Sequence, residues 1–223
     1  MNNIPFNVGV VIVCAGRGKR LGNRIDKPLL ELKGKPLFFR TYEIFKNTKK
    51  IKQIVIVLRK EHFGQAKKII KDKKVIFCEG GRERKDSVLN GILALDKSIN
   101  YVLIHDGARP FTPKNVILNI IKELKSYPAV ICGIKSKDTL KLANKDFVVK
   151  TLDRNIIFLI QTPQGFRKDI IVKAYSNLNG KKVFDDAGAV ESIGEKVKIV
   201  DGSPVNIKIT YPEDISLAKA IIR

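Results

Sequence analysis

The sequence predicts an α/β fold in which helices cover both faces of a mostly parallel, wound β-sheet. Short apolar runs rich in β-branched residues alternate with amphipathic segments of helical period, and polar loops, several rich in glycine, follow the apolar runs. The alternation breaks near residue 140, where two short strand-like runs flank a turn, so a β-hairpin arm is expected to protrude from the sheet. The length of 223 residues suits a single Rossmann-like domain spanning residues 1–223.

The individual elements follow from local patterns along the chain. The first apolar run, residues 8–14, is rich in valine and is typical of a strand buried on both faces of a sheet. Pro36 and Pro212 suit the first turn of a helix, where an N–H group has no partner to lose. Further strands are expected at residues 53–58, 74–78, 101–104, 129–134, 140–142, 147–151, 196–200 and 207–210. Helices are expected at residues 36–46, 61–71, 86–96, 113–125, 168–176, 186–193 and 212–222, and a loop at residues 161–166.

The hairpin belongs to a segment from about residue 136 to residue 156. Its two short strands flank the turn signal Ala143-Asn144-Lys145-Asp146. Arms of this kind often pack on a partner subunit. We therefore expect this segment to be an arm that packs on a partner subunit.

Composition narrows the class of protein. Hydrophobic residues make up 44% of the chain, which is typical of a globular protein rather than a disordered one. No apolar run approaches the roughly 20 residues that a membrane span needs, and the N-terminal MNNIPFN lacks the basic region of a secretory signal. Cys14, Cys78 and Cys132 lie far apart without a C-x-x-C pair, so we expect core thiols rather than a zinc site or a disulfide framework. These features favour the reducing cytoplasm and no membrane partner.

The formal net charge of +21 is the most unusual feature of the composition. A basic chain raises the alternative of a nucleic-acid-binding protein, which would bind duplexes tightly at physiological salt. Here, however, the lysines are spread along the whole chain, with little aromatic interleaving and no known nucleic-acid motif. We expect solvated surfaces that attract anionic substrates, and no specific nucleic-acid partner.

The loop that follows the first strand is crowded with glycine and cationic residues. It runs from Gly16 to Lys27 and contains Arg17, Gly18, Lys19, Arg20, Gly22 and Arg24. Glycines let backbone N–H groups approach phosphate oxygens closely, and the cations neutralise them. The spacing matches neither the dinucleotide fingerprint nor the Walker A loop, which disfavours a nicotinamide enzyme. A surface turn with solvated charges remains the alternative for this stretch taken alone.

Four strand ends carry polar loops, and in a wound sheet these loops meet at one edge. The edge would bring together the cations Arg20, Lys27, Arg84 and Arg109, the hydroxyls of Ser87 and Thr139, and the carboxylate of Asp106. Many cations around one carboxylate suit a phosphate-rich substrate with Mg²⁺, so phosphoryl or nucleotidyl transfer is predicted. The alternative for Asp106 is a turn residue that pairs with Arg109. We expect His105 to orient the loop and His62 to lie on the surface.

With these loops in view, the chain closely resembles the 2-C-methyl-D-erythritol 4-phosphate cytidylyltransferases of the non-mevalonate isoprenoid pathway. The resemblance spans essentially the whole chain. It rests on the joint order of Ala15-Gly16-x-Gly18-x-Arg20, Lys27, Gly80-Gly81-x-x-Arg84-x-x-Ser87-Val88, His105-Asp106-x-Ala108-Arg109-Pro110, Asp138-Thr139-x-Lys141, Thr151-x-Asp153-Arg154, residues 161–166 (QTPQGF), Asp185-Asp186-Ala187 and residues 206–210 (NIKIT).

The resemblance implies transfer of CMP from CTP to methylerythritol 4-phosphate, by in-line attack with Mg²⁺ bound. By position, Arg20 and Lys27 would be catalytic and Asp106 would hold the metal. The implied nucleotide-binding residues are Ala15, Gly16, Gly18, Gly81, Arg84 and Ser87. The implied acceptor-binding residues are Arg109, Thr139, Arg154, Thr162 and Lys208. The family is a homodimer with crossing arms, so Arg154 and its neighbours would serve the partner's site.

The chain departs from the family pattern near the expected site. Cys14 stands where the pattern has alanine, Gly107 stands for another alanine, and Asp26-Lys27-Pro28 replaces Pro-Lys-Gln. Arg82 and Phe184 are also unusual. The related ribitol 5-phosphate cytidylyltransferases are the alternative acceptor branch, although Phe166 and the run at residues 151–154 (TLDR) favour the methylerythritol branch.

Overall fold

The computed structural model describes residues 6–16, 18–21, 26–178 and 180–222 of the chain. The expectations for Arg17, Gly22 and Arg24 therefore fall outside the described residues. Within the described part, a central sheet of seven strands has the order β11-β7-β10-β6-β1-β4-β5. Its strands are β1 (Val8–Val13), β4 (Ile51–Leu58), β5 (Val75–Glu79), β6 (Tyr101–Asp106), β7 (Ala129–Lys135), β10 (Phe158–Arg167) and β11 (Lys198–Asp201).

The sheet is mixed but mostly parallel, as the sequence predicts. β1 pairs in parallel with both β4 and β6, β4 with β5, and β7 with β11, whereas β10 runs antiparallel to β6 and β7. β1 is an interior strand between β6 and β4, and its residues Val8, Val10, Val11 and Ile12 are fully buried. A valine-rich run is stable there because both faces of a central parallel strand are covered.

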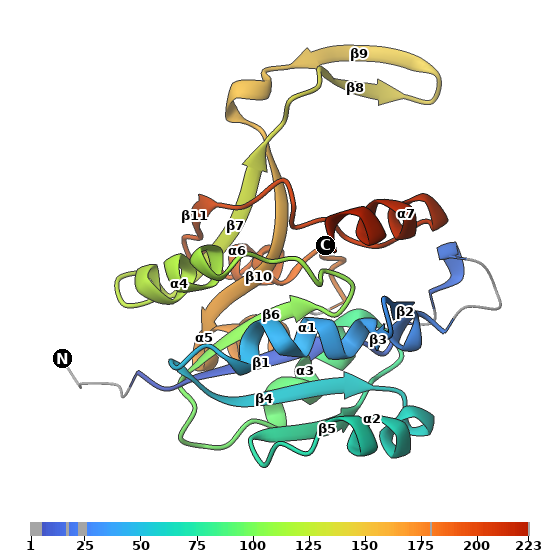
Figure 1. Cartoon of the computed structure of the whole chain (residues 1–223). Helices are drawn as coiled ribbons and strands as arrows, with labels where there is room; N and C mark the ends of the chain where they lie inside the picture. Colours follow the sequence, from blue (N-terminus) through green and yellow to red (C-terminus); the bar gives the residue numbers. More distant parts are fainter. Residues whose placement is uncertain (1–5, 17, 22–25, 179, 223) are drawn as a thin grey trace.

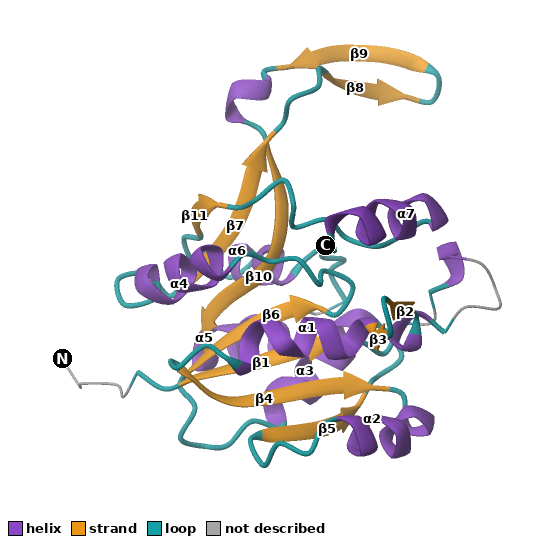
Figure 2. Ribbon diagram, viewed as in Figure 1, coloured by secondary structure: helices purple, strands orange, loops and turns teal. Residues whose placement is uncertain are grey.

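Helices cover both faces of the sheet (Figures 1 and 2). One core cluster joins the sheet to α1 (Leu37–Lys46), α2 (Phe63–Ile69) and α4 (Lys114–Glu123). The other joins it to α3 (Arg84–Leu93), α5 (Lys168–Ser176) and α6 (Asp186–Glu191). On α1, Leu37, Phe38, Tyr42 and Phe45 are buried, as their helical spacing predicts.

A smaller third cluster attaches the last helix to the edge that carries the glycine loop. It contains Leu21, Leu32, Leu37, Ile209 and Ala218, and so connects α7 (Pro212–Ile221) to the two-stranded β2 (Glu31–Leu32) and β3 (Lys35–Pro36). Short 3-10 helices span Lys19–Leu21, Lys27–Leu29, Lys60–His62 and Arg154–Ile156.

The hairpin arm is formed by β8 (Leu140–Asn144) and β9 (Phe147–Leu152), which pair with each other in a separate sheet. Figure 1 shows the arm at the top of the view, well away from the central sheet. Phe147, Val148 and Val149 are 78%, 62% and 59% exposed. Such a run of exposed apolar side chains is unusual on a free surface.

Two expectations about secondary structure were wrong. Residues 161–166 do not form a loop but belong to β10, because the side chains of Gln161 and Gln164 are buried and find hydrogen-bond partners elsewhere in the fold. Gln164 Nε2 donates to Asp185 Oδ2 at 2.8 Å, and Gln161 Nε2 donates to the Ser203 carbonyl at 2.9 Å. Residues 207–210 form no strand, and the Ile209 N–H instead donates to the Ala108 carbonyl at 2.9 Å.

Among the described residues, no helix is long and apolar enough to cross a membrane. Cys14, Cys78 and Cys132 are free thiols. Cys14 and Cys132 are buried as predicted, and Cys78 is half-buried.

Gly91 fixes how closely α3 packs on the sheet, and a substitution there should be costly. A Cβ atom at Gly91 would lie 2.4 Å from Val11 Cγ1 and 2.8 Å from Val57 Cγ2, both on buried strands. We expect Gly91→Ala to lower the free energy of unfolding in urea by about 1–3 kcal/mol through overpacking.

Gly64 on α2 offers a matched control, because a Cβ atom there would have no neighbour within 4 Å. Gly64→Ala should be neutral or stabilising by up to about 1 kcal/mol. Equal effects of the two substitutions would contradict the close α3 packing.

Candidate active site

A cleft of about 780 Å³ opens at the carboxyl ends of β1, β5 and β6. This edge of an α/β sheet is where ligands usually bind, because several strand-end loops converge there. Nine of the predicted site residues line the cleft: Ala15, Gly16, Gly18, Lys27, Gly81, Arg84, Ser87, Asp106 and Lys208. Strands and loops far apart in the sequence thus form one site.

Close backbone contacts shape one wall of the cleft. A Cβ atom at Gly80 would lie 2.2 Å from Ala15 Cβ, so only glycine lets the loop after β5 approach the loop after β1. Ser87 Oγ accepts a hydrogen bond from the Gly81 N–H at 3.0 Å and donates to the Glu83 carbonyl at 3.1 Å. Ser87 therefore holds the glycine loop in place at the start of α3, where the positive end of the helix dipole favours an anion.

Asp106 is the carboxylate on which the cations of the cleft converge. Its Oδ2 lies 2.7 Å from Lys208 Nζ, and its Oδ1 lies 3.2 Å from Arg84 Nη2. Burial by itself would raise the pKa of Asp106, but the charges of Arg84 and Lys208 outweigh it and hold that pKa well below its usual range. The carboxylate therefore stays ionised at physiological pH.

Arg84 is shared between two carboxylates. Its Nη1 and Nη2 form a bidentate pair with the fully buried Asp186 at 2.9 and 2.8 Å, while its Nε donates to Asp106 at 3.2 Å. Tyr175 Oη donates to Asp186 Oδ1. Burial favours the neutral guanidine, but Asp186 and Asp106 raise the pKa of Arg84, so it remains charged. Sequence reasoning assigned no role to Asp186 or Tyr175, although Asp186 belongs to a quoted motif.

Thr162, His105 and Arg109 support Asp106 from behind rather than facing the cleft. The Asp106 N–H donates to Thr162 Oγ1 at 3.0 Å, and Thr162 Oγ1 lies 3.1 Å from His105 Nδ1. His105 Nε2 lies 3.0 Å from the Arg109 carbonyl, which accepts its proton, so Nδ1 accepts from Thr162. Burial lowers the pKa of His105 to about 4, which keeps the ring neutral. His105 thus orients the loop, as expected.

The Asp106–Arg109 pair of the turn alternative is weak. Arg109 Nε lies 4.0 Å from Asp106 Oδ2, and Arg109 Nη1 donates to the Asn206 carbonyl at 2.7 Å. Asp106 is thus held mainly by Arg84 and Lys208, and Arg109 ties the loop after β6 to the segment before α7.

The pKa of the Lys27 amine is lower than that of an ordinary lysine. Burial lowers the pKa of Lys27 to about 8, and the charge of Lys208 adds to this effect, while Asp106 opposes it. An amine of this kind is less hydrated than a surface lysine and interacts strongly with an anion that enters the cleft.

Besides Arg109 and Thr162, three predicted site residues lie outside the lining of the cleft. Arg20 is exposed, and its guanidinium carbon lies 5.8 Å from the ring centre of Tyr211. Thr139 and Arg154 are exposed at the base of the arm, where Arg154 Nη1 donates to the Lys137 carbonyl at 2.9 Å. The described residues of this one chain therefore do not bring Arg154 to the cleft.

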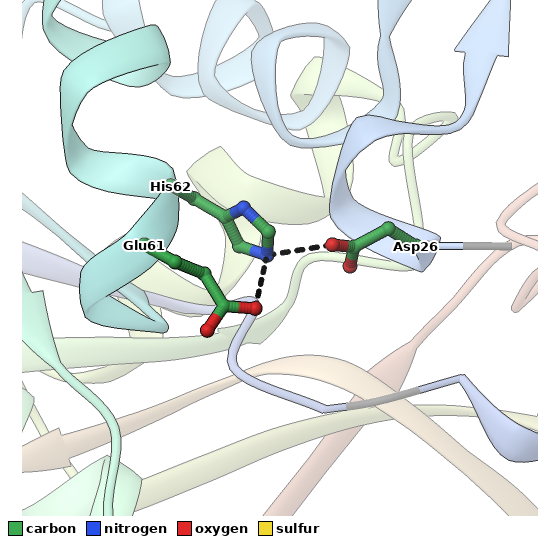
Figure 3. Close-up of side chains that lie close together, drawn as sticks. All are labelled: Asp26, Glu61 and His62. Atoms are coloured by element: carbon green, nitrogen blue, oxygen red, sulfur yellow. Dashed lines mark ion pairs between the residues drawn. The ribbon is translucent and has the colours of Figure 1, made fainter.

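The structure adds Arg59 to the cleft, a residue that sequence reasoning missed although it directly follows a predicted strand. The expectation that His62 lies on the surface was wrong, because its side chain is only 6% exposed. Figure 3 shows His62 Nε2 facing the carboxylates of Asp26 and Glu61, at 2.9 and 3.9 Å. A helix-start position does not reveal such burial, since Asp26 comes from a distant loop.

Several known proteins are similar in sequence to most of this chain. The model of the 2-C-methyl-D-erythritol 4-phosphate cytidylyltransferase family matches residues 8–223. Relatives with that name include one from Clostridium botulinum (strain Loch Maree / Type A3), 41% identical over 221 residues, covering 96% of each chain. Another, from Caldanaerobacter subterraneus subsp. tengcongensis, is 40% identical over 228 residues, covering 98% of this chain and all of the relative.

A solved structure is also similar. The 4-diphosphocytidyl-2C-methyl-D-erythritol synthase of Anaerococcus prevotii superposes with a TM-score of 0.88 at 36% identity, covering 96% of this chain and 95% of that one. The 2-C-methyl-D-erythritol 4-phosphate cytidylyltransferase structure from Thermus thermophilus has a TM-score of 0.81 at 27% identity and covers 96% and 98%.

Two departures from the family pattern fit each other in the wall of the cleft. A Cβ atom at Gly107 would lie 2.1 Å from Cys14 Sγ and 3.1 Å from the Val13 carbonyl oxygen. We expect Gly107→Ala to be strongly destabilising, because neither the buried sulfur nor the backbone can move away. The double variant with Cys14→Ala should recover most of the loss, as urea unfolding of both variants would measure.

Cys14→Ala alone is the control for this pair. It leaves a small void where the sulfur was, so it should cost only about 1 kcal/mol. If the losses of the two single variants simply added in the double variant, the contact between positions 14 and 107 would be excluded as their cause.

Proposed function

The chain belongs to the 2-C-methyl-D-erythritol 4-phosphate cytidylyltransferase family, and on that premise we propose how the cleft carries out the reaction of the family. The enzyme is a nucleotidyltransferase that moves CMP from CTP to 2-C-methyl-D-erythritol 4-phosphate. The products are 4-diphosphocytidyl-2-C-methyl-D-erythritol and pyrophosphate, and the reaction belongs to isoprenoid biosynthesis. The observation that carries the proposal is the convergence of Lys27, Arg84 and Lys208 on Asp106 beside two glycine-rich loops.

The reaction brings two anions together, and this determines what the protein has to supply. A phosphate oxygen of the acceptor forms a bond to the α-phosphorus of CTP, and the bond from that phosphorus to the bridging oxygen of the β-phosphate breaks. Pyrophosphate leaves with the bonding electron pair. Positive charge is needed to reduce the repulsion of the approaching phosphates and to stabilise the charge on the leaving group.

Lys27 is placed to stabilise the transition state, because it lines the cleft and lies close enough to Lys208 and Asp106 for their charges to affect its pKa. We assign Arg20 a similar role on the leaving pyrophosphate, which requires its side chain to turn from Tyr211 towards the cleft. The nucleotide lies along Ala15, Gly16, Gly18, Gly81 and Ser87, where the backbone is open to it. Arg84 contributes mainly by orienting Asp106, because Asp186 already holds it.

Nucleotidyltransferases typically use a divalent metal, and Asp106 has the chemistry to hold Mg²⁺. It is ionised, it faces the cleft, and it offers the hard oxygen ligands that Mg²⁺ prefers. A bound Mg²⁺ would neutralise charge on the triphosphate. Lys208 and Arg84 already contact Asp106, so they would share it with the ion and remain close to the phosphates.

The acceptor and the partner subunit belong to the same part of the proposal. Thr139 and Arg154 lie at the base of the arm, outside the cleft of their own chain. We therefore assign them, with the arm at residues 136–156, to the site of the second subunit in a homodimer. Lys208 binds the acceptor from within the chain, while Arg109 and Thr162 act through the loop of Asp106.

The remaining parts of the proposal concern organisation and environment. We place the protein in the cytoplasm as one nucleotidyltransferase domain, and its three free thiols suit a reducing compartment. Its high positive charge would increase the encounter rate with anionic substrates, without a specific nucleic-acid partner.

Pyrophosphate release tests the reaction and the acceptor together. The purified protein is supplied with CTP and Mg²⁺, and with either 2-C-methyl-D-erythritol 4-phosphate or ribitol 5-phosphate, and each reaction is repeated with EDTA. We expect turnover with the methylerythritol acceptor alone and none with EDTA. Turnover with ribitol 5-phosphate alone would keep the chemistry and reassign the acceptor. No turnover with either acceptor would reject the proposal.

The pH dependence of kcat/KM should report Lys27. Its amine must be protonated to stabilise an anion, and its pKa is about 8. We expect kcat/KM to fall above about pH 8, approaching tenfold per pH unit. Arginine stays protonated, so Lys27→Arg should have lower activity near neutral pH but lose this decline. Lys27→Ala should lower kcat by a much larger factor than it lowers the affinity for CTP, which calorimetry measures. A wild-type profile that stays flat to pH 10 would contradict the role of Lys27.

The arm should determine the oligomeric state. Replacing the exposed Phe147 and Val149 by aspartate places charge on the surface assigned to the partner. We expect the double variant to sediment as a monomer and to lose activity, because each site then lacks the partner's arm. Leu93→Asp is the control, since Leu93 is 65% exposed but lies on α3. A dimer that survives the arm double variant would place the interface elsewhere.

A further inference from the structure

We propose that Asp26, Arg59 and His62 form an anchor that positions Lys27, and that this anchor sets the catalytic rate. The proposal rests on the proposed function, since it concerns how one catalytic residue of that function is held. We define the anchor as the side chains of these three residues. It is a positioning device, because only Lys27 is assigned to the reacting phosphates.

The anchor begins directly beside the catalytic lysine. Asp26 precedes Lys27 and stands at the N-cap of the 3-10 helix Lys27–Leu29, yet its side chain does not cap that helix. Asp26 instead contacts Arg59, with its Oδ1 2.5 Å from Nη2, and His62, with its Oδ2 2.9 Å from Nε2. Both oxygens of the carboxylate therefore point to residues more than 30 positions away in the chain.

The other end of the anchor is fixed in the sheet. Arg59 directly follows β4, whose last five residues are buried, and Arg59 Nη1 contacts Glu61 Oε1 at 2.6 Å. The side chain of His62 is 6% exposed. Contacts made from this firmly packed end hold Asp26, and on the other side of Lys27 the buried Pro28 restricts the backbone. Lys27 is thus held from both sides.

A metal site is the obvious alternative for this cluster, since Asp26, Glu61 and His62 each offer a ligand atom within 4.8 Å of the others (Figure 3). The guanidinium of Arg59 argues against it. Arg59 Nη2 lies 2.9 Å from His62 Nε2 as well as 2.5 Å from Asp26, so the cluster already holds a cation. Arg59 is a donor that already has Asp26 Oδ1 as its acceptor at 2.5 Å, so we assign the proton of the His62 ring to Nε2, which donates it to Asp26 Oδ2 at 2.9 Å.

The anchor matters for rate because Lys27 acts over a short distance. A displacement of about 1 Å in a catalytic group can cost as much as 100-fold in rate. An isolated exposed ion pair would be too weak to prevent such a displacement. Here one carboxylate is held by two partners, one of them almost fully buried, so its release requires both contacts to break.

The test compares three substitutions in the full-length enzyme. His62→Leu keeps an apolar side chain of similar size and removes the donor to Asp26. His62→Gln keeps a donor near the position of Nε2. Glu43→Gln is the control, because it breaks a comparable ion pair, with Lys35 at 2.7 Å, on the exposed face of α1. Urea unfolding checks that each variant is folded under the assay conditions.

We expect His62→Leu to lower kcat by roughly tenfold or more while KM for CTP changes by less than about twofold. His62→Gln and Glu43→Gln should stay close to the wild type. His62→Leu with wild-type kcat would overturn the anchor. The same holds if His62→Gln loses as much rate as His62→Leu, because the donor to Asp26 would then be irrelevant.

A second measurement needs no turnover. Lysine-specific labelling at a series of pH values, followed by mass spectrometry, gives the pH midpoint for Lys27 in the free protein. The wild-type midpoint should lie near 8. In His62→Leu, a freed Lys27 becomes better hydrated, and its midpoint should rise towards the ordinary lysine value of 10.5. An unchanged midpoint, with activity lost only in proportion to unfolded protein, would reduce His62 to a structural role and reject the proposal.

The two measurements separate this proposal from the proposed function. If the wild-type enzyme fails to release pyrophosphate, the function is wrong, and the labelling midpoint still decides whether the anchor holds Lys27. If the wild type turns over normally and the midpoint of His62→Leu is unchanged, the function stands and the anchor is overturned.

Discussion

The mutual repulsion of the cations is the constraint on which the rest of the site depends. Lys27, Arg84 and Lys208 all line one cleft, and without compensation their charges would repel one another and separate the loops that carry them. The negative charge of Asp106 offsets these cations on the side that faces the cleft. The negative charge of Asp186 offsets the charge of Arg84 from behind. Both carboxylates are supplied by packed parts of the fold, β6 and the start of α6. The cations can then remain close together before a phosphate arrives, and less rearrangement is needed when it binds.

This charge arrangement explains why the site stands at the end of the central strands. β6 ends with Asp106, and β1 lies directly beside it, with Val13 opposite Asp106 in the parallel register. The glycine loop that follows β1 therefore starts next to the carboxylate. On the other side, the Asp106 N–H is fixed by Thr162 from the antiparallel β10. β10, the strand that departs from the parallel order, therefore helps to hold the central carboxylate.

The sequence was sufficient for most of the fold and for most of the cleft, because those parts follow local rules. Alternating apolar runs located the strands of the sheet, and glycine and cations at strand ends located the lining residues Ala15, Gly16, Gly18 and Lys27. The errors fall where long-range contacts override local pattern. Residues 161–166 contain polar side chains and proline, but Gln161 and Gln164 are buried and have partners that only the tertiary structure supplies. In the same way, the burial of His62 depends on Asp26, 36 positions earlier, and no local pattern indicates that contact.

The fit between Cys14 and Gly107 constrains how the alanine of the family pattern can be exchanged at each of these two positions. The two exchanges differ in what they require of the rest of the protein. Loss of the methyl group at position 107 opens space, which a folded protein tolerates at small cost. Arrival of sulfur at position 14 needs that space to exist already, since the overlap would otherwise be within 2.1 Å. In this backbone, cysteine at position 14 is therefore compatible with glycine at position 107 but not with alanine there. The residue at one position of this cleft wall thus limits which residues the other position can hold.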